Sequence, residues 1–271
     1  MAQLVKLYDY VSRYETNPFH YPTQFIRLKK QNWQRFSQKR NIQEQPTPEK
    51  KQQLIQTFLN QLLPFQYKWA TSTITHQSYT DKKHIHDEVL TYFLQRFPDI
   101  YLIMYYPLFS IKKAPIDGEI ILISPVGIEI IHVFKGIRDA TIVATDNRTW
   151  TVETGQRTES IMSPLITLKR TEQIIASILK AHEVSLPIQK TVLSETNELL
   201  YHTKPYKTNM IGKREYETWF MEKRALQSPL KNIQLKAMEA LLNHCQSTSV
   251  RRPEWKKDDD SYMSVEEFEE T

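Results

Sequence analysis

The sequence predicts an α/β protein with a strand-rich centre between two helical ends. All five glycines lie between positions 118 and 212, and the first 117 residues have none. Glycine serves turns and weakens helices, so this distribution favours helices first and a turn-rich β section later. The centre holds two nearly continuous apolar runs, 119–124 and 128–134, joined by Pro125-Val126-Gly127. Such runs are typical of strands buried on both faces of a sheet.

Three helices are expected in the N-terminal region, residues 1–79. Residues 3–15 place apolar side chains on one helical stripe. Residues 25–40 indicate a second helix that is basic and carries aromatic side chains. Residues 49–63 indicate a third helix, which Pro64 is expected to end because proline breaks a helix interior.

The central region, residues 80–195, alternates predicted helices with predicted strands. Ser163-Pro164 supplies an N-cap and a first-turn proline for one of these helices. The expected elements are a helix over 81–96, strands over 101–109, 119–124 and 128–134, a hairpin of 140–145 with 150–153, a helix over 164–182 and a strand over 188–194. This order predicts a mixed central sheet flanked by helices.

The C-terminal part is expected to be helical again, over residues 196–247. One helix is predicted for 213–226, and a second opens at Ser228-Pro229 and runs to Cys245. Residues 248–271 lack apolar periodicity and are expected to form a disordered acidic tail.

The charge distribution favours a polyanionic partner. Residues 1–252 contain 34 basic and 23 acidic side chains, a net +11, whereas the remaining residues contain two basic and eight acidic ones, a net −6. A basic body attracts nucleic acid, although a solvated surface with an acidic tail explains the same charges equally well.

The composition also excludes several classes of protein. No apolar stretch approaches the roughly 18 residues that a membrane-spanning helix needs, so no membrane partner is expected. The first residues carry charges and no cleavage site, which argues against a secretory signal. A single cysteine, Cys245, excludes a disulfide framework and multi-cysteine metal sites, so we expect a reducing cytoplasm.

One phrase in the centre carries a family resemblance. The residues from Asp117 to Gly136 read DGEIILISPVGIEIIHVFKG. They resemble the nuclease-related domain family, a bacterial branch of the PD-(D/E)XK nuclease fold, in the Ser124-Pro125-x-Gly127 turn and in both flanking strands. The resemblance covers roughly residues 80–195 and implies a restriction-endonuclease-like core that processes DNA.

The resemblance also implies a catalytic site, and this chain departs from it. Family members carry an Asp on the first strand and Glu-x-Lys on the second, which hold Mg²⁺ or Mn²⁺ and polarise the attacking water. Counting from the turn, the Asp falls on Glu119, the Glu on His132 and the Lys on Phe134. Glu88 could supply a further helical carboxylate. A pseudoenzyme with impaired catalysis is therefore expected.

Neighbouring residues offer a rescue of the site. Asp117 shares a strand face with Glu119 if the strand extends that far, and a bulge before Gly136 could turn Lys135 toward His132. Asp117, Glu119 and His132 would then hold a metal such as Mn²⁺, for which imidazole is an acceptable ligand. Otherwise His132 is a hydrogen-bonded core histidine and the two carboxylates belong to a strand entry.

Three functions therefore remain open. The first is a nucleic-acid-binding or scaffolding role without cleavage, the second an active and divergent metal-dependent DNA nuclease, and the third a protein-interaction module. In the first, the basic and aromatic second helix is expected to contact nucleic acid. Its candidate binding residues are Arg27, Lys29, Lys30, Arg35, Lys39 and Arg40.

Overall fold

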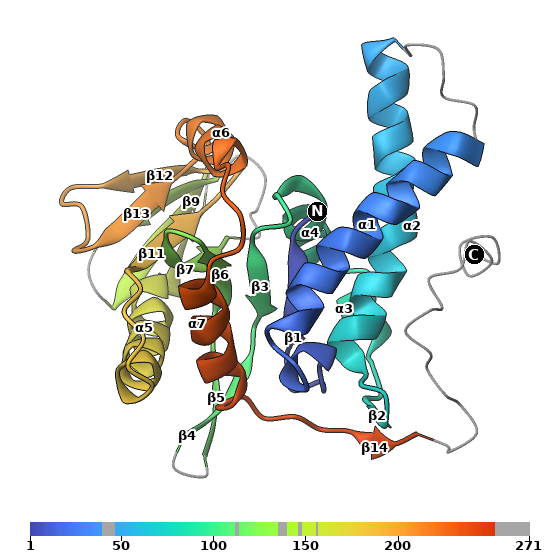
Figure 1. Cartoon of the computed structure of the whole chain (residues 1–271). Coiled ribbons are helices and arrows are strands. Elements are labelled where there is room, and N and C mark those ends of the chain that lie inside the picture. The colour runs from blue at the N-terminus through green and yellow to red at the C-terminus, as the bar shows by residue number, and fades with distance from the viewer. Residues whose placement is uncertain (40–46, 112–113, 135–139, 146–147, 156, 253–271) are drawn as a thin grey trace. The chain divides into compact units, whose positions relative to one another are not determined.

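The computed structural model describes residues 1–252 apart from 40–46, 112–113, 135–139, 146–147 and 156. The chain is a mixed α/β protein and divides into two compact units (Figure 1). The N-terminal unit comprises Met1–Asp99 and the chain from Ser247 onward, and the central unit comprises Ile100–Gln246. Within the described residues, every helix is too short or too polar to cross a membrane.

The N-terminal unit is built mainly from two helices and a buried strand. Helices α1 (His20–Lys39) and α2 (Pro48–Thr71) cross each other and pack through Trp33, Phe36 and Phe58, whose ring centroids lie 5.1 to 5.7 Å apart (Figure 1). Its elements are β1 (Gln3–Leu7), the 3-10 turn Arg13–Glu15, α1 (His20–Lys39), α2 (Pro48–Thr71), β2 (His76–Gln77), α3 (Lys82–Ile85), α4 (Glu88–Arg96) and β14 (Val250–Arg251). The basic second helix is thus confirmed.

The first predicted helix, over residues 3–15, is wrong. Residues Gln3–Leu7 form strand β1, and all five are buried. The segment therefore lacks the exposed face that an amphipathic helix would have. The side chain of Gln66 on α2 satisfies part of the strand backbone. Its Oε1 accepts from Leu4 N at 3.0 Å, and its Nε2 donates to Ala2 O at 2.7 Å.

Two helix boundaries in this unit also differ from the prediction. Helix α2 continues through Pro64 to Thr71, because burial of Gln66 and Trp69 beyond the proline offsets the hydrogen bond that proline cannot make. The single helix expected over 81–96 is two helices, since Asp87 accepts from Val89 N and Leu90 N and so starts α4 anew.

The chain beyond residue 246 returns to the N-terminal unit. Val250 and Arg251 pair antiparallel with Gln77 and His76. In addition, Lys6 Nζ donates to Ser247 Oγ at 2.6 Å. The prediction of disorder from residue 248 is therefore wrong up to residue 252, and residues 253–271 lie outside the described part of the chain.

His84 gives the N-terminal unit a pH dependence. Its Nδ1 lies 2.9 Å from Tyr10 Oη, and its ring stacks on Tyr8 at 4.0 Å. Burial, assisted by the Lys83 cation and partly opposed by nearby carboxylates, lowers the His84 pKa below its usual 6.5. A lowered folded-state pKa means that the unfolded chain binds the proton more tightly than the folded chain. The stability that neutral His84 contributes is therefore fully present above pH 6.5 and is lost as the pH falls through the lowered pKa.

We therefore expect the stability difference between the wild type and His84→Gln to shrink as the pH falls from about 7.5 to about 5. Urea unfolding at each pH measures it. His202→Gln, at an exposed position, is the matched control. A wild-type advantage over His84→Gln that stays constant with pH would contradict the expectation.

The central unit is built on a mixed sheet in the order β3-β6-β7-β11-β13. Strands β3, β6 and β7 run antiparallel in sequence, and β11 and β13 add parallel to β7. Its strands are β3 (Leu102–Tyr105), β6 (Ile120–Ser124), β7 (Gly127–Val133), β11 (Ile188–Leu193) and β13 (Thr208–Ile211). The predicted hairpin at Ser124-Pro125-Val126-Gly127 is confirmed, with Ser124 opposite Gly127.

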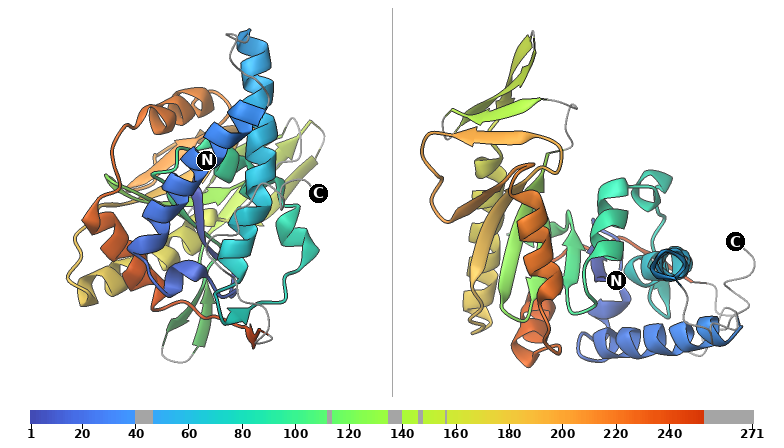
Figure 2. Two further views of the ribbon diagram at one scale, coloured as in Figure 1. Left: turned by 45° about the vertical axis from the view of Figure 1, so that its right-hand side comes forward. Right: turned by 90° about the horizontal axis from the view of Figure 1, so that it is seen from above.

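Two smaller sheets complete the β structure described in this unit. One has the order β10-β9-β8-β12, and Figure 2 shows its β8 to β10 ribbon extending beyond the main sheet. The other pairs β4 with β5. The members are β8 (Thr141–Ala144), β9 (Thr149–Thr154), β10 (Arg157–Met162), β12 (Glu198–Tyr201), β4 (Leu108–Ile111) and β5 (Ala114–Asp117). The strand expected over 101–109 is thus two strands, which part at Tyr106 with a φ of 46°.

Three helices pack on the main sheet or beside it. Helix α5 (Pro164–Ala181), predicted from its Ser-Pro start, contacts β7 and β11. Helix α7 (Asn232–Leu242) contacts β6 and α5, and its Gln234 donates to Ile100 O and Ile123 O. Helix α6 (Tyr216–Ala225) follows β13. The helix expected to open at Ser228-Pro229 begins later, at Asn232. Its first turn is capped at Lys231, whose backbone N–H donates to Gln234 Oε1.

Candidate functional site

The structure brings Glu119 and His132 together. Glu119 directly precedes β6, and His132 lies on β7, whose antiparallel register places Ile120 opposite Ile131. His132 Nδ1 lies 3.1 Å from Glu119 Oε1. The Glu119 side chain is 8% exposed and that of His132 is 28% exposed. An ionised carboxylate only accepts hydrogen bonds, so this pair needs a proton on Nδ1 whenever Glu119 is charged.

Aromatic side chains and α5 enclose this pair. The Phe134 ring meets the His132 ring edge-on at 5.2 Å, and its other neighbour is Trp150 at 6.0 Å. Thr171 on α5 accepts from the Glu119 backbone N–H at 3.2 Å. The shared face of His132 and Phe134, which strand alternation predicts, is therefore present.

Asp117 does not join this pair. The strand does not extend from Asp117 to Glu119, because β5 ends at Asp117 and pairs with β4 in another sheet. Gly118 marks the break: its N–H donates to Pro107 O at 2.8 Å, and a Cβ there would lie 2.9 Å from the Phe109 ring. Among the described residues, no hydrogen bond or ion pair links the exposed Asp117 carboxylate to Glu119 or His132.

The other predicted catalytic residues are not assembled here. Lys135 lies outside the described residues. Glu88 is the first residue of α4, exposed, and belongs to the N-terminal unit. Its use as a third catalytic carboxylate, beside Asp117 and Glu119, stays a prediction.

The donors at this site do not fit Mg²⁺. Magnesium needs several hard oxygen ligands in near-octahedral geometry, whereas the neighbour of Glu119 is an imidazole. Glu119 Oε2 is buried and lacks a hydrogen-bond partner within the described chain, so one carboxylate oxygen is available as a ligand. However, no group of three or more His, Cys, Asp or Glu side chains in the described ranges could hold a metal ion. The described residues at this site therefore do not form a Mg²⁺ site.

Five of the six predicted nucleic-acid-binding residues lie on α1. Lys29 forms an ion pair with Asp99, so part of its charge is neutralised within the N-terminal unit. Arg40 lies outside the described residues. The remaining four candidates are exposed on the helix: Arg27, Lys30, Arg35 and Lys39.

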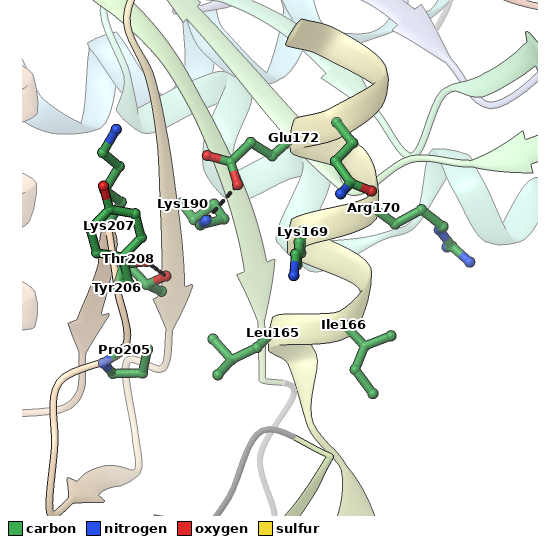
Figure 3. Close-up of a pocket in the computed structure, with 11 residues that line it drawn as sticks. Leu165, Ile166, Lys169, Arg170, Glu172, Lys190, Pro205, Tyr206, Lys207 and Thr208 are labelled. Atoms are coloured by element: carbon green, nitrogen blue, oxygen red, sulfur yellow. Dashed lines mark hydrogen bonds and ion pairs between the residues drawn. The ribbon is translucent and has the colours of Figure 1, made fainter. Parts of the chain in front are cut away.

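A basic cavity in the central unit is a feature that the sequence did not reveal. It has a volume of about 610 Å³ and lies among α5, β11 and β13 (Figure 3). Four cationic side chains and one carboxylate line it, together with Tyr206. The charged lining residues are Lys169, Arg170, Lys190, Lys207 and Glu172. They come from segments far apart in the sequence, so no local motif announces them.

A buried carboxylate on the other face of β7 also escaped the sequence analysis. Glu129 accepts hydrogen bonds from Thr191 and from Trp219 Nε1, and its Oε2 lies 2.6 Å from Lys223 Nζ. Burial, with a smaller contribution from the charge of Glu129, raises the pKa of Tyr101 above its usual range. Tyr101 donates to Lys223 O at 3.0 Å. This network anchors α6 to the sheet.

The fold and site thus define a mixed α/β protein with a partly buried Glu–His pair and a basic cavity. No protein-family model matches the chain, and no solved structure matches it. The chain is 59% identical over 34 residues to a protein of Geobacillus stearothermophilus described as an RNA 2',3'-cyclic phosphodiesterase. That match spans 12% of this chain and 11% of the other protein.

Proposed function

We propose that this chain is a nuclease-related protein that binds nucleic acid and has lost phosphodiester cleavage. The observation that carries the proposal is the pairing of Glu119 with His132 beside Phe134. The β3-β6-β7 meander, the helix α5 and the parallel strand β11 also fit the restriction-endonuclease-like core that the sequence resembles.

The chemistry of cleavage explains why this pair argues against it. Phosphodiester hydrolysis requires a hydroxide near neutral pH and compensation of the extra charge on phosphate, which paired carboxylates with a divalent ion and a nearby ammonium supply. Here His132 occupies the position of the second carboxylate and already engages Glu119. Phe134 occupies the position of the ammonium, and its ring packs on the His132 ring.

The charge of the protein supports binding. The first 252 residues have a net charge of +11, and exposed cations occupy both α1 and the cavity beside α5. Neutralising phosphates releases counterions, so cations of this kind favour nucleic acid without sequence preference. We also propose a cytoplasmic location, for which the single cysteine is the support.

The full-length protein, incubated with Mg²⁺ or Mn²⁺, is expected to leave plasmid and single-stranded DNA intact and to retard both in a gel. Removing two exposed cations of α1 in Arg27→Ala/Lys30→Ala should reduce the salt slope of duplex binding by about two, since each phosphate contact contributes about 0.9. Lys50→Ala/Lys51→Ala, which removes two exposed cations of α2, is the matched control.

Two results would contradict this proposal. Metal-dependent cleavage that Glu119→Ala abolishes would show an active, divergent nuclease. Binding that is absent, or independent of salt, would remove the nucleic-acid partner and favour a protein-interaction module.

A further inference from the structure

We infer that the basic cavity beside α5 binds single-stranded nucleic acid, with a phosphate at its lysines and a base stacked on Tyr206. This inference rests on the proposed function and names the form of nucleic acid and the residues that select it. The cavity volume of about 610 Å³ lies within the roughly 300–1,000 Å³ of small-ligand sites, so it suits a nucleotide unit rather than a duplex.

The centre of the cavity holds an ion pair. Lys190 on β11 is 8% exposed and already holds an anion, the Glu172 carboxylate of α5 (Figure 3). Lys190 and Thr208 are register partners on β11 and β13, so their side chains lie on the same face, toward α5. The Glu172 carboxylate neutralises part of the Lys190 charge and repels a further anion, so a phosphate is bound mainly by the cations of the cavity rim.

The rim adds cations that can follow a phosphate backbone. Lys169 is exposed, and within the described chain it has no ion-pair partner. Lys207 stands across the cavity from Lys169, on the β13 side (Figure 3). Glu172 is the only carboxylate among the described lining residues, so cations outnumber anions by four to one.

Tyr206 supplies the surface for a base. It is 81% exposed, and Lys207 Nζ lies 5.4 Å from its ring centroid. Pro205, Leu165 and Ile166 give the cavity apolar walls nearby. An exposed ring beside lysines is the combination by which proteins bind single strands, because bases that are not paired present a free face for stacking.

The test uses the full-length protein with a fluorescent dT oligonucleotide and an abasic strand of equal length and phosphate count. Fluorescence anisotropy is expected to show about tenfold tighter binding of the dT strand, because stacking of one base contributes about that factor. Tyr206→Ala should remove this preference and Tyr206→Phe should keep it. Lys169→Ala should weaken binding of both strands and reduce the salt slope by about 0.7.

Matched variants outside the cavity separate this inference from general charge effects. Tyr201→Ala, at a ring 42% exposed on β12, and Lys180→Ala, at an exposed lysine of α5, should bind both strands like the wild type. Equal wild-type affinity for both strands, or Tyr206→Ala and Lys169→Ala that bind like the wild type, would overturn the cavity assignment and leave the proposed function standing. Failure of the wild type to bind either strand would overturn both.

Discussion

Replacing Trp69 by alanine is expected to lower the free energy of unfolding by about 3–5 kcal/mol, the range for truncation of a buried tryptophan. Trp69 is 2% exposed and lies at the centre of the N-terminal unit. Its ring contacts four aromatic neighbours with centroid distances between 4.7 and 6.1 Å, and the Arg13 guanidinium lies 5.3 Å from its ring centroid. The aromatic neighbours are Tyr14, Tyr21, Phe25 and Phe65.

The size of this effect follows from the cavity that alanine would leave. Four rings and a guanidinium that pack on the indole cannot all collapse into its volume, so transfer and cavity costs add. Urea unfolding followed by far-UV circular dichroism measures the change without relying on tryptophan fluorescence. Tyr79→Ala, at a ring 81% exposed in the same unit, should change stability by less than about 0.5 kcal/mol. A loss below about 1 kcal/mol in Trp69→Ala would contradict the packing.

Replacing Lys223 by methionine is expected to destabilise the central unit by about 3 kcal/mol, the lower end for breaking a buried ion pair. Methionine keeps the length of the side chain and removes the ammonium 2.6 Å from Glu129. The Glu129 side chain is only 8% exposed, so a carboxylate would remain in the interior without its cation. Lys223 itself is 27% exposed, which is why we expect the lower end.

A double variant separates the unpaired charge from lost packing. Glu129→Gln/Lys223→Met leaves no buried charge and should recover a large part of the stability lost in Lys223→Met. Lys236→Met, at an exposed position of α7, is the control for the substitution itself. Equal stability of Lys223→Met and the double variant would show that the unpaired Glu129 carboxylate costs nothing.

Local patterns predicted much of the central unit and part of its candidate site. The Pro-Gly turn fixed the β6–β7 hairpin, and strand alternation then placed His132 and Phe134 on one face beside Glu119. Helix α5 followed from its N-cap and first-turn proline. These features depend on neighbours in the sequence.

What could not be predicted depends on partners distant in the sequence. Residues 3–7 carry an apolar spacing that also suits a helix. In the structure they form a strand that is buried on both faces, Lys6 included, and this burial depends on partners distant in the sequence. Glu129 sits in an apolar run, and its partner Lys223 lies on α6. The basic cavity likewise needs α5, β11 and β13 together, an arrangement that no single segment contains.

The return of the chain after Gln246 has a consequence for biosynthesis. The central unit is an insertion within the N-terminal one, because Ser247 and the strand Val250–Arg251 complete contacts with Lys6 and with His76–Gln77. During translation the whole central unit is therefore synthesised before the C-terminal segment that completes the N-terminal unit. The part synthesised first is therefore completed last, and until Val250 and Arg251 are made, the strand His76–Gln77 lacks this pairing partner.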